Sequence, residues 1–500
     1  MKVVLCLLPG LLLSAQTAPV PYFEPKHRVA GIGISREDLS DDLLQVRTDL
    51  MIQSQTFAIL REPLALIGAR RITGPKLQSL FRNASKRSGF PLADLEAISY
   101  LESWGDPKAQ SPAGPRGIMQ IAEGTARRIG LKVVHGKRYV VTTEKVAVKR
   151  KGKTTYKTVR HRTATDAIVR DDRLSPERSI NAAAKYLAGM EQRFGGRDWA
   201  IFAYHCGEGC VSEILDLTRR ANGESLVQAT VARTFFCASP ARNRDLYQAL
   251  QRNMLRDYSP TYWFRVRRAQ ELLALFRRNP SSFAELADSY RSDFSAGPRA
   301  PNRLTVWLRR QDLVYQTGSD LRADDGRRLA RVLDQPEFFG YALSEAIGAA
   351  DPENQPYYLQ ATPAALGTLL YIAFETRRLH RALAPEEGFL PLEVTSLVQP
   401  VGPANGAGTD LPHPRPEVLA HASGHVFDIS YERLPPGERE CLRFVLDDLG
   451  WEGYLGFVQE GPETVHVGCS PGSREFFASV FQDALEAVKP VQDTTKTDAQ

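Results

Sequence analysis

A basic segment, residues 132–170, interrupts a chain whose flanking stretches are patterned as helices. It contains twelve Lys and Arg residues but only two acidic residues. Its side chains alternate as they do in strands, and the sequence KRKGKT in its middle predicts a hairpin turn at Gly152. The stretches 36–85 and 171–260 show helical periodicity. We therefore predict a mainly helical domain that carries an inserted basic β-hairpin.

The ends and the length of the chain limit its class. Five hundred residues exceed one ordinary hydrophobic core, so we expect two or three domains. The start, MKVVLCLLPGLLLSAQTAP, has one cation, a short apolar run and then small residues, which predicts a cleaved signal peptide over 1–18. The alternative is a membrane anchor, but a bilayer span needs about 20 apolar residues. We expect export to the periplasm or cell envelope, and no membrane span after the signal.

Export would allow disulfides among the remaining cysteines. Cys441 and Cys469 could pair in the last domain. Cys206 and Cys210 flank a glycine-containing turn, and metal binding by this pair is the rival interpretation.

One carboxylate stands out in the stretch AISYLESWGDPKAQ. Glu102 lies near the end of an apolar helical run, which Asp106 and Pro107 are expected to stop. A carboxyl group on an apolar face tends to have a raised pKa, because burial disfavours its charged form. Such a group suits general acid catalysis. By itself, however, a Glu at a helix end is more often a solvated surface residue.

The residues around Glu102 follow a recognisable order. Those that carry it are Glu102-Ser103, Ala109, Ser111, Gly114, Gly117, Met119, Gln120, Thr125-Ala126 and, downstream, Ala203-Tyr204-His205-Cys206-Gly207. This order resembles the soluble lytic transglycosylases and their goose-type-lysozyme-like relatives. The sequence departs from that pattern at Pro115, at Ile118 and at His205-Cys206, which stand in place of Ala, Leu and Asn-Ala.

The resemblance implies a lysozyme-like fold and a peptidoglycan substrate. Glu102 would protonate the glycosidic oxygen and then take the proton of the 6-hydroxyl, leaving a 1,6-anhydromuramic end without any cofactor. Residues implied to bind the substrate or support its site are Ser103, Ser111, Met119, Gln120, Tyr204 and His205. His205 could replace the usual Asn as a donor, or be structural. A hydrolytic lysozyme would need a second carboxylate, for which Asp106, Asp171 and Asp172 are the candidates.

A second group of polar residues lies near the C-terminus. His421 and Asp428 occur in LAHASGHVFDIS, and Glu463 and His466 occur in GPETVHVG. Two His and one Asp can hold zinc with a fourth position left for water, and a nearby Glu could act as base. His425 is a rival ligand.

The spacing H-x-x-G-x-x-x-D followed by E-x-x-H resembles the zinc D-Ala-D-Ala peptidases and L-alanyl-D-glutamate endopeptidases. This resemblance implies an α+β domain in which His421, Asp428 and His466 bind zinc and Glu463 is the base. Residues three apart on a strand face opposite ways, so Glu463 must lie before the strand of His466 or on a bend. Gln399 stands where that family has a substrate-facing Arg, and Leu419 where it has Ser.

The whole chain is thus expected to be an exported lytic transglycosylase with a second zinc-dependent activity on peptidoglycan stem peptides. The alternatives are a hydrolytic lysozyme and a non-catalytic cell-wall-binding scaffold. The basic insert is either a solvated hairpin or a landing site for anionic envelope polymers, and export argues against nucleic acid. The predicted divisions are a signal peptide 1–18, an N-terminal helical segment 19–85, a lysozyme-like domain 86–260 with its insert 132–170, a helical connector 261–345, a zinc-peptidase-like domain 346–490 and a polar tail 491–500.

Overall fold

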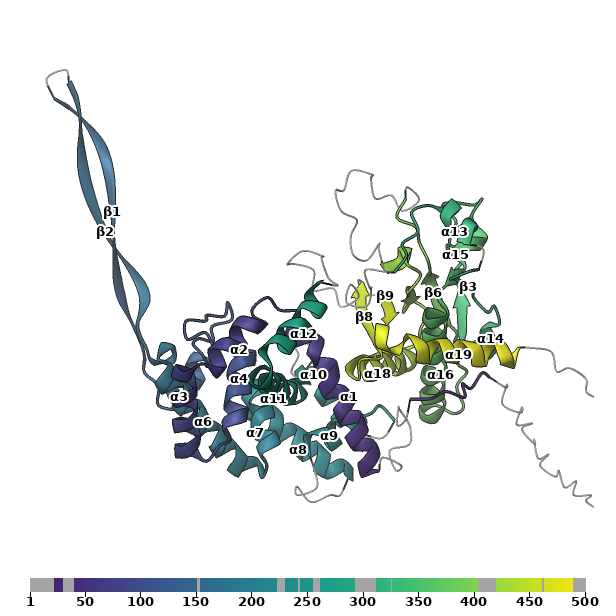
Figure 1. Ribbon diagram of the computed structural model, residues 1–500, viewed down its shortest axis with the longest axis horizontal. Helices are drawn as coiled ribbons and strands as arrows, with labels where there is room; N and C mark the ends of the chain where they lie inside the picture. Colours follow the sequence, from purple (N-terminus) through teal and green to yellow (C-terminus); the bar gives the residue numbers. More distant parts are fainter. Residues whose placement is uncertain are drawn as a thin grey trace, which may run out of the picture.

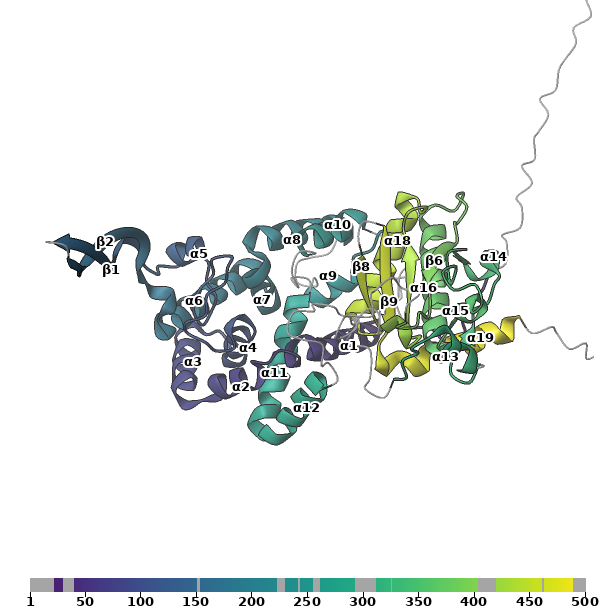
Figure 2. The ribbon, with the colours of Figure 1, turned by 90° about the horizontal axis from the view of Figure 1, so that it is seen from above.

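The computed structural model describes most of the chain, in ten stretches. These are residues 22–29, 40–150, 153–222, 230–241, 243–254, 261–292, 312–324, 326–402, 420–460 and 463–488. A helical part and a part built on a β-sheet lie side by side, and a long hairpin projects from the helical part (Figures 1 and 2). The predicted signal peptide and tail lie outside the described residues. Within them, no helix combines the length and the apolar character that crossing a bilayer requires.

The helical part confirms the prediction of a mainly α domain. Helix α4 lies in its middle and packs against α2, α3 and α11. Its core includes the fully buried side chains of Phe81, Phe90, Ile98, Phe202 and Phe264. The helices are α1 (Asp41–Leu60), α2 (Ala65–Thr73), α3 (Pro75–Ser88), α4 (Leu92–Ser103), α5 (Glu123–Arg128), α6 (Pro176–Phe194), α7 (Arg197–Cys206), α8 (Glu208–Asn222), α9 (Val231–Cys237), α10 (Arg244–Met254), α11 (Tyr262–Arg278) and α12 (Pro280–Ser292).

The predicted hairpin is also confirmed. Strands β1 (Val133–Arg150) and β2 (Lys153–Asp171) pair antiparallel as a two-stranded ribbon, up to Arg150 opposite Lys153. The predicted turn residue, Gly152, lies outside the described residues. The ribbon stands away from the helices as an arm, which twists along its length (Figure 1).

The C-terminal part is built on a five-stranded sheet of order β4-β6-β7-β9-β8. The β4–β6 pair is parallel and the other pairs are antiparallel. Helices α16 and α18 pack on the sheet, and α19 packs on α16. The elements are α13 (Gly318–Asp324), β3 (Ala330–Arg331), α14 (Pro336–Phe339), β4 (Tyr341–Leu343), α15 (Gln355–Tyr358), β5 (Gln360–Ala361), α16 (Pro363–Leu383), β6 (Leu392–Ser396), β7 (Val426–Ser430), α18 (Pro436–Trp451), β8 (Leu455–Glu460), β9 (Thr464–Cys469) and α19 (Arg474–Ala487).

The structure divides the chain differently from the prediction of a connector over 261–345. Helix α11 packs against α1 and α4, because it buries Trp263, Phe264 and Leu272 in the helical core. At the other end of the predicted connector, β4 is an edge strand of the C-terminal sheet. The helical part therefore continues beyond residue 260, and the C-terminal part starts before residue 346.

A buried ion-pair cluster joins the two parts. Arg47 of α1 donates to Glu452 (Nε to Oε1, 2.7 Å) and to Asp448 (Nη2 to Oδ1, 2.8 Å), and all three side chains are buried. The Arg47 guanidinium also lies 4.5 Å from the centre of the Phe236 ring. Burial raises the pKa of Glu452 although Arg47 opposes this effect. The cluster therefore holds α1 against the end of α18 at the cost of desolvating its charges.

Arg47→Met should destabilise the protein by about 3–5 kcal/mol, because it leaves two buried carboxylates without their cation. A matched control is Arg244→Met at the exposed Arg244–Glu440 pair between α10 and α18, where less than about 1 kcal/mol is expected. Chemical denaturation followed by circular dichroism measures both. Equal small losses would show that the buried cluster is not what holds the two parts together.

Candidate active site and candidate metal centre

Glu102 lies in the last turn of α4, and its side chain is 17% exposed. The helix ends at Ser103, because Trp104 (φ 53°) and Gly105 (φ 67°) take left-handed conformations. The Gly105 amide then donates to the Ser99 carbonyl at 3.3 Å, which closes the helix end. Asp106 was predicted to stop the helix, but it lies beyond the stop, where its carboxylate accepts from the Lys108 amide at 2.8 Å.

Two side chains from other helices approach the same oxygen of Glu102. The Tyr262 hydroxyl at the start of α11 donates to Oε1 at 2.8 Å. Nδ1 of His205, at the end of α7, lies 3.9 Å from this atom. The two rings are stacked, with centres 4.4 Å apart and an angle of 5° between them. Three helices thus converge on one carboxylate.

Tyr262 is a site residue that the sequence analysis missed. It is separated from Glu102 by 160 positions and belongs to the stretch that was predicted to connect domains. Its only signal in the sequence is that it opens an apolar helical run, TYWFRV, which is equally typical of a core helix. Burial raises the pKa of Tyr262, and the charge of Glu102 raises it further, so its hydroxyl stays protonated and remains a donor.

Tyr204 occupies the place expected from the motif but acts on the backbone. Its hydroxyl donates to the Met119 carbonyl at 2.7 Å. Burial, followed by the charge of Glu102, raises the pKa of Tyr204. The hydroxyl therefore ties α7 to the loop after α4 rather than contacting the carboxylate directly.

Ser103 and Met119 support the loop instead of presenting side chains to a substrate. Both are buried. The Ser103 hydroxyl donates to the Ile118 carbonyl at 2.7 Å. The remaining predicted residues, Ser111 and Gln120, are half-buried. Gln120 has a φ of 44°, and its side-chain amide donates to the carbonyls of Gly117 at 2.9 Å and Ala109 at 3.2 Å.

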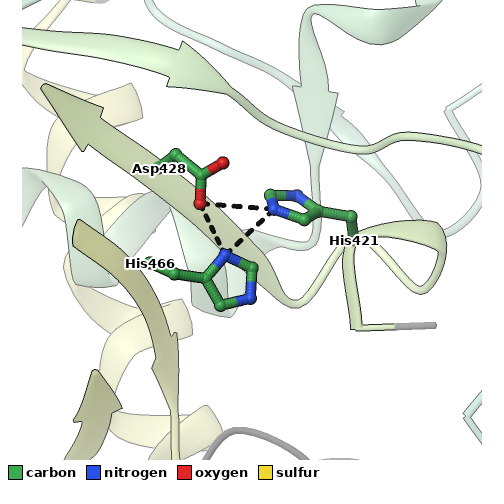
Figure 3. A group of neighbouring side chains, drawn as sticks. All are labelled: His421, Asp428 and His466. Atoms are coloured by element: carbon green, nitrogen blue, oxygen red, sulfur yellow. Dashed lines mark hydrogen bonds and ion pairs between the residues drawn. The ribbon is translucent and has the colours of Figure 1, made fainter. Parts of the chain in front are cut away.

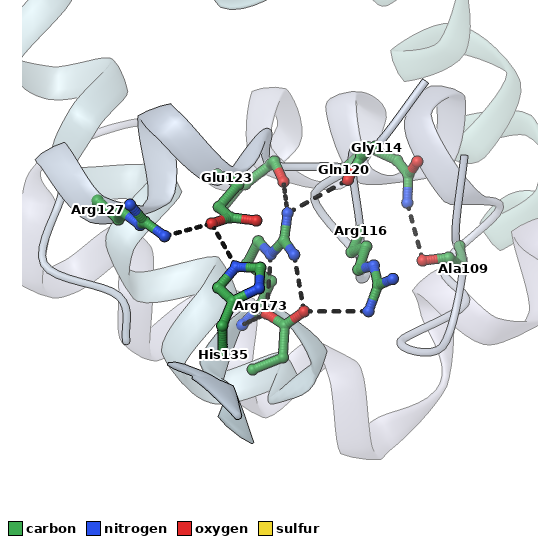
Figure 4. Close-up of polar contacts among 10 residues, drawn as sticks. Ala109, Gly114, Arg116, Gln120, Glu123, Arg127, His135 and Arg173 are labelled. Carbon is green, nitrogen blue, oxygen red and sulfur yellow. Dashed lines mark hydrogen bonds and ion pairs between the residues drawn. The ribbon is translucent and has the colours of Figure 1, made fainter. Parts of the chain in front are cut away.

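Arg173 fixes the same loop from below (Figure 4). Its buried guanidinium pairs with both oxygens of Asp171 at 2.8 Å. It also donates to the Ile121 and Gly114 carbonyls at 3.2 and 3.3 Å. Asp171 ends strand β2 of the arm, so Arg173 joins the root of the arm to the loop that follows Glu102. No motif pointed to Arg173.

The three candidates for a second carboxylate are engaged in holding the backbone. Asp171 pairs with Arg173, and Asp172 accepts from the Lys132 amide and from Arg178. Hydrogen bonds and these charges outweigh burial and lower the pKa of both groups. Asp106 closes its own turn, as described above. None of the three is therefore left as a second catalytic carboxylate by these contacts.

Gly117→Ala should destabilise the helical part by at least about 2 kcal/mol, because Gly117 has a φ of 79° and an added Cβ would lie 1.9 Å from the Arg173 carbonyl oxygen. Gly124→Ala, in helix α5, is the control. Nothing lies within 4 Å of its Cβ position, and Ala is favoured over Gly in a helix. Thermal unfolding distinguishes them; unchanged stability of Gly117→Ala would contradict the close approach.

The second candidate site gathers His421, Asp428 and His466 (Figure 3). Their ligand atoms lie within 4.8 Å of one another. Oδ1 of Asp428 lies 2.5 Å from Nδ1 of His466 and 3.3 Å from Nε2 of His421, and the two nitrogens are 3.0 Å apart. Asp428 and His466 are directly opposite on β7 and β9. Their strand neighbours Val465 and Val467 are buried in the hydrophobic core, so alternation places the polar pair on the other face.

The surroundings of His421 set the direction of its ring. Nδ1 lies 2.7 Å from the Leu397 carbonyl and 3.2 Å from the Ser396 hydroxyl. A proton on Nδ1 leaves the Nε2 lone pair aimed at Asp428 and His466, which is the arrangement of a metal-ligating His. Gln399, which stands in place of the expected Arg, donates to Ser396 at 2.6 Å. The donor set, two imidazoles and one carboxylate converging on one point, fits Zn²⁺.

Asp428 is ionised in this arrangement. Burial alone would raise its pKa, but the charges and hydrogen bonds of His421 and His466 lower it well below the usual range. The cluster therefore presents one carboxylate oxygen beside two imidazole nitrogens.

The other predicted residues are not members of this three-residue cluster. Glu463 precedes β9, as predicted, and is exposed; its carbonyl accepts from the Tyr431 amide. His425 lies 3.5 Å from Asp312 and 3.1 Å from the Thr362 hydroxyl. The five described cysteines are free thiols, so the suggested Cys441–Cys469 disulfide is absent from the described residues.

Comparison with known proteins finds a family that is similar to a large portion of the helical part. Residues 79–145 and 153–227 match the family described as "Transglycosylase SLT domain". This range contains α4 with Glu102, the loop after it, most of the arm and α7. This portion of the mostly helical, multidomain chain is therefore similar to SLT transglycosylase domains.

Individual relatives agree with this family. The chain is 34% identical over 131 residues to the "Peptidoglycan transglycosylase gp16" of Escherichia phage T7, a match to 26% of this chain and 8% of that protein. It is 29% identical over 156 residues to a "Membrane-bound lytic murein transglycosylase F" of Alcanivorax borkumensis, covering 30% of this chain and 25% of that one. For a relative from Alkalilimnicola ehrlichii the figures are 25% over 235 residues, 42% and 40%. The chain thus spans less than half of each of these relatives.

Proposed function

We propose that this protein is a peptidoglycan lytic transglycosylase that cleaves the MurNAc–GlcNAc bond with Glu102. The single observation that carries this proposal is the convergence of Tyr262 and His205 on Glu102, a carboxylate that lies within the residues matched by the SLT family. The names of the relatives, which act on murein or peptidoglycan, support the substrate. They also support an envelope location, in line with the predicted signal peptide.

The proposed reaction uses Glu102 twice. As an acid it gives its proton to the glycosidic oxygen while the bond from that oxygen to C1 of the muramic sugar breaks. As a base it then takes the proton of the 6-hydroxyl of the same sugar, whose oxygen bonds to C1. The product is a 1,6-anhydromuramic end, and no water is consumed. The Tyr262 hydroxyl donates to the carboxylate that exists between these steps and so stabilises and orients it.

Hydrolysis is the main alternative, and the structure disfavours it. A hydrolytic mechanism generally places a second carboxylate at a set separation from the first. The three candidates are engaged with arginines or backbone amides instead. A scaffold without catalysis would not require a buried tyrosine hydroxyl on a carboxylate.

Glu102→Gln should abolish the release of soluble muropeptides from purified sacculi, because the amide cannot exchange the proton. Tyr262→Phe should lower kcat about tenfold or more, since one hydrogen bond to a charged group is lost, with little change in KM. Mass spectrometry of the products reports both rate and chemistry. Anhydro ends are expected; reducing ends would establish hydrolysis, and activity retained by Glu102→Gln would exclude Glu102 as the acid.

We also propose that His421, Asp428 and His466 bind a zinc ion and that the C-terminal part acts on stem peptides. Zinc, when bound, lowers the pKa of a coordinated water and so supplies a nucleophile at neutral pH. The three side chains would hold the ion, and Leu397 and Ser396 would orient His421. Glu463 is the proposed base. Gln399 would offer the substrate a neutral amide, where the zinc-peptidase pattern has a charged Arg. The charge-assisted contact that an Arg makes is therefore missing at this position.

The purified protein should contain about one zinc per chain. His421→Ala should remove this zinc, because the loss of one of three protein ligands lowers the affinity for the ion many-fold. His425→Ala is the matched control, since this imidazole lies with Asp312 outside the cluster. Plasma emission spectrometry after dialysis measures the metal. Zinc content that is substoichiometric in the parent and equal in both variants would refute the site.

The basic arm completes the proposal. Its cations would attract anionic polymers of the envelope by long-range charge, so that binding weakens as salt is added. The arm's root is joined to the loop after Glu102 through Asp171 and Arg173. An attracted polymer is therefore held on the same domain as the catalytic carboxylate.

A further inference from the structure

The two faces of the arm differ in chemistry. Residues directly opposite on antiparallel strands share a face, so the register assigns each side chain. We name one the tyrosine face; it consists of Lys137, Tyr139, Val141, Thr143, Lys145 and Ala147 with Tyr156, Thr158, Arg160, Arg162, Ala164 and Asp166. The other, the valine face, consists of Arg138, Val140, Thr142, Glu144 and Val146 with Lys157, Val159, His161, Thr163 and Thr165.

Positive charge is concentrated on the tyrosine face. It carries four cations and one carboxylate, Asp166, which is paired with Lys137 at 2.7 Å. The valine face carries two cations and one carboxylate, Glu144, 3.7 Å from His161. The net formal charge is therefore +3 on the tyrosine face and +1 on the valine face. Arg160 and Lys145 make no ion pair within the described residues, so their charges are available to a ligand.

Two exposed aromatic rings bracket these cations. Tyr139 and Tyr156 are 54% and 72% exposed. They lie at opposite ends of the stripe, with Arg162, Arg160 and Lys145 between them. The Arg162 guanidinium lies 4.0 Å from the centre of the Tyr139 ring, which holds that ring in place. A flat exposed ring with a polar tip is a surface that binds another flat, partly apolar ring.

We propose that the tyrosine face is an auxiliary binding site for a peptidoglycan strand, at which sugar rings stack on Tyr139 and Tyr156 and stem-peptide carboxylates pair with Arg160, Arg162 and Lys145. This inference rests on the proposed function and extends it. The eight residue-to-residue steps from Tyr139 to Ala147, which is opposite Tyr156, span about 26 Å of strand. This length accommodates several sugars.

A linear polymer suits the geometry of the arm better than a flat surface does. The aromatic and cationic side chains follow one another in a single stripe along a narrow, twisted ribbon. A strand bound there raises the concentration of its neighbouring bonds at Glu102, because both sites belong to one domain. The arm therefore holds the insoluble substrate between cleavage events.

The test is co-sedimentation of full-length protein with purified sacculi stripped of attached polymers, in a Glu102→Gln background so that the sacculi stay intact. Tyr139→Ser with Tyr156→Ser, and Arg160→Gln with Arg162→Gln, should each weaken binding roughly tenfold. The matched control, Arg138→Gln with Lys157→Gln, removes the same charge from the valine face and should change binding by less than about twofold. All six side chains are exposed, and circular dichroism verifies that the fold is retained.

Equal losses in the control and the Arg160/Arg162 variant would show that charge alone attracts the polymer, and would overturn the proposed face. Tighter binding to duplex DNA or to phosphatidylglycerol vesicles than to sacculi would overturn the proposed partner. Sacculus binding does not require turnover. Glycan cleavage that persists in Glu102→Gln would therefore refute the proposed function and leave the outcome for the arm independent.

Discussion

The buried guanidinium of Arg173 is the interaction on which the geometry of the helical part depends. It pairs with Asp171 at the end of the arm and donates to two carbonyls of the loop that follows Glu102. The backbone carbonyl of Arg173 lies so close to Gly117 that no side chain fits at position 117. A buried cation is tolerated only when its donors are satisfied, so the loop, the arm root and α6 are fixed together. The glycine in the loop and the arginine after the arm thus form one steric and electrostatic unit.

Local features of the fold could be predicted from the sequence because they depend on neighbouring residues. The alternation of 132–170 predicted the hairpin, and the apolar run before Glu102 predicted the helix that carries it. The stop of that helix was misplaced by a few residues. Trp104 in a left-handed conformation has no signature in the sequence, since only glycine and a few polar residues usually adopt it. Asp106 and Pro107 predicted the stop, but the helix already ends at Ser103.

The catalytic surroundings could be predicted only where a motif is contiguous. Tyr204 and Gln120 were found from the motif, but their role is to bind backbone carbonyls. Tyr262 and Arg173 were missed because each reaches its partner through tertiary packing. The run that begins with Tyr262 has the same apolar pattern as a core helix, although the side chain that opens it donates to a carboxylate. A contact across 160 residues has no local pattern from which it could be inferred.

The two candidate sites each orient a carboxylate, but they do so with different neighbouring groups. Each keeps a carboxylate in a partly apolar place and directs it with a neighbouring ring. Around Glu102 the direction comes from a neutral hydroxyl, Tyr262, whose raised pKa keeps it a donor to the carboxylate. Around Asp428 two imidazoles lower the pKa of the carboxyl group, so it stays ionised. The first arrangement suits proton transfer and the second suits a cation. The groups that surround each carboxylate, rather than the carboxylates themselves, therefore separate the proposed chemistry of the two halves.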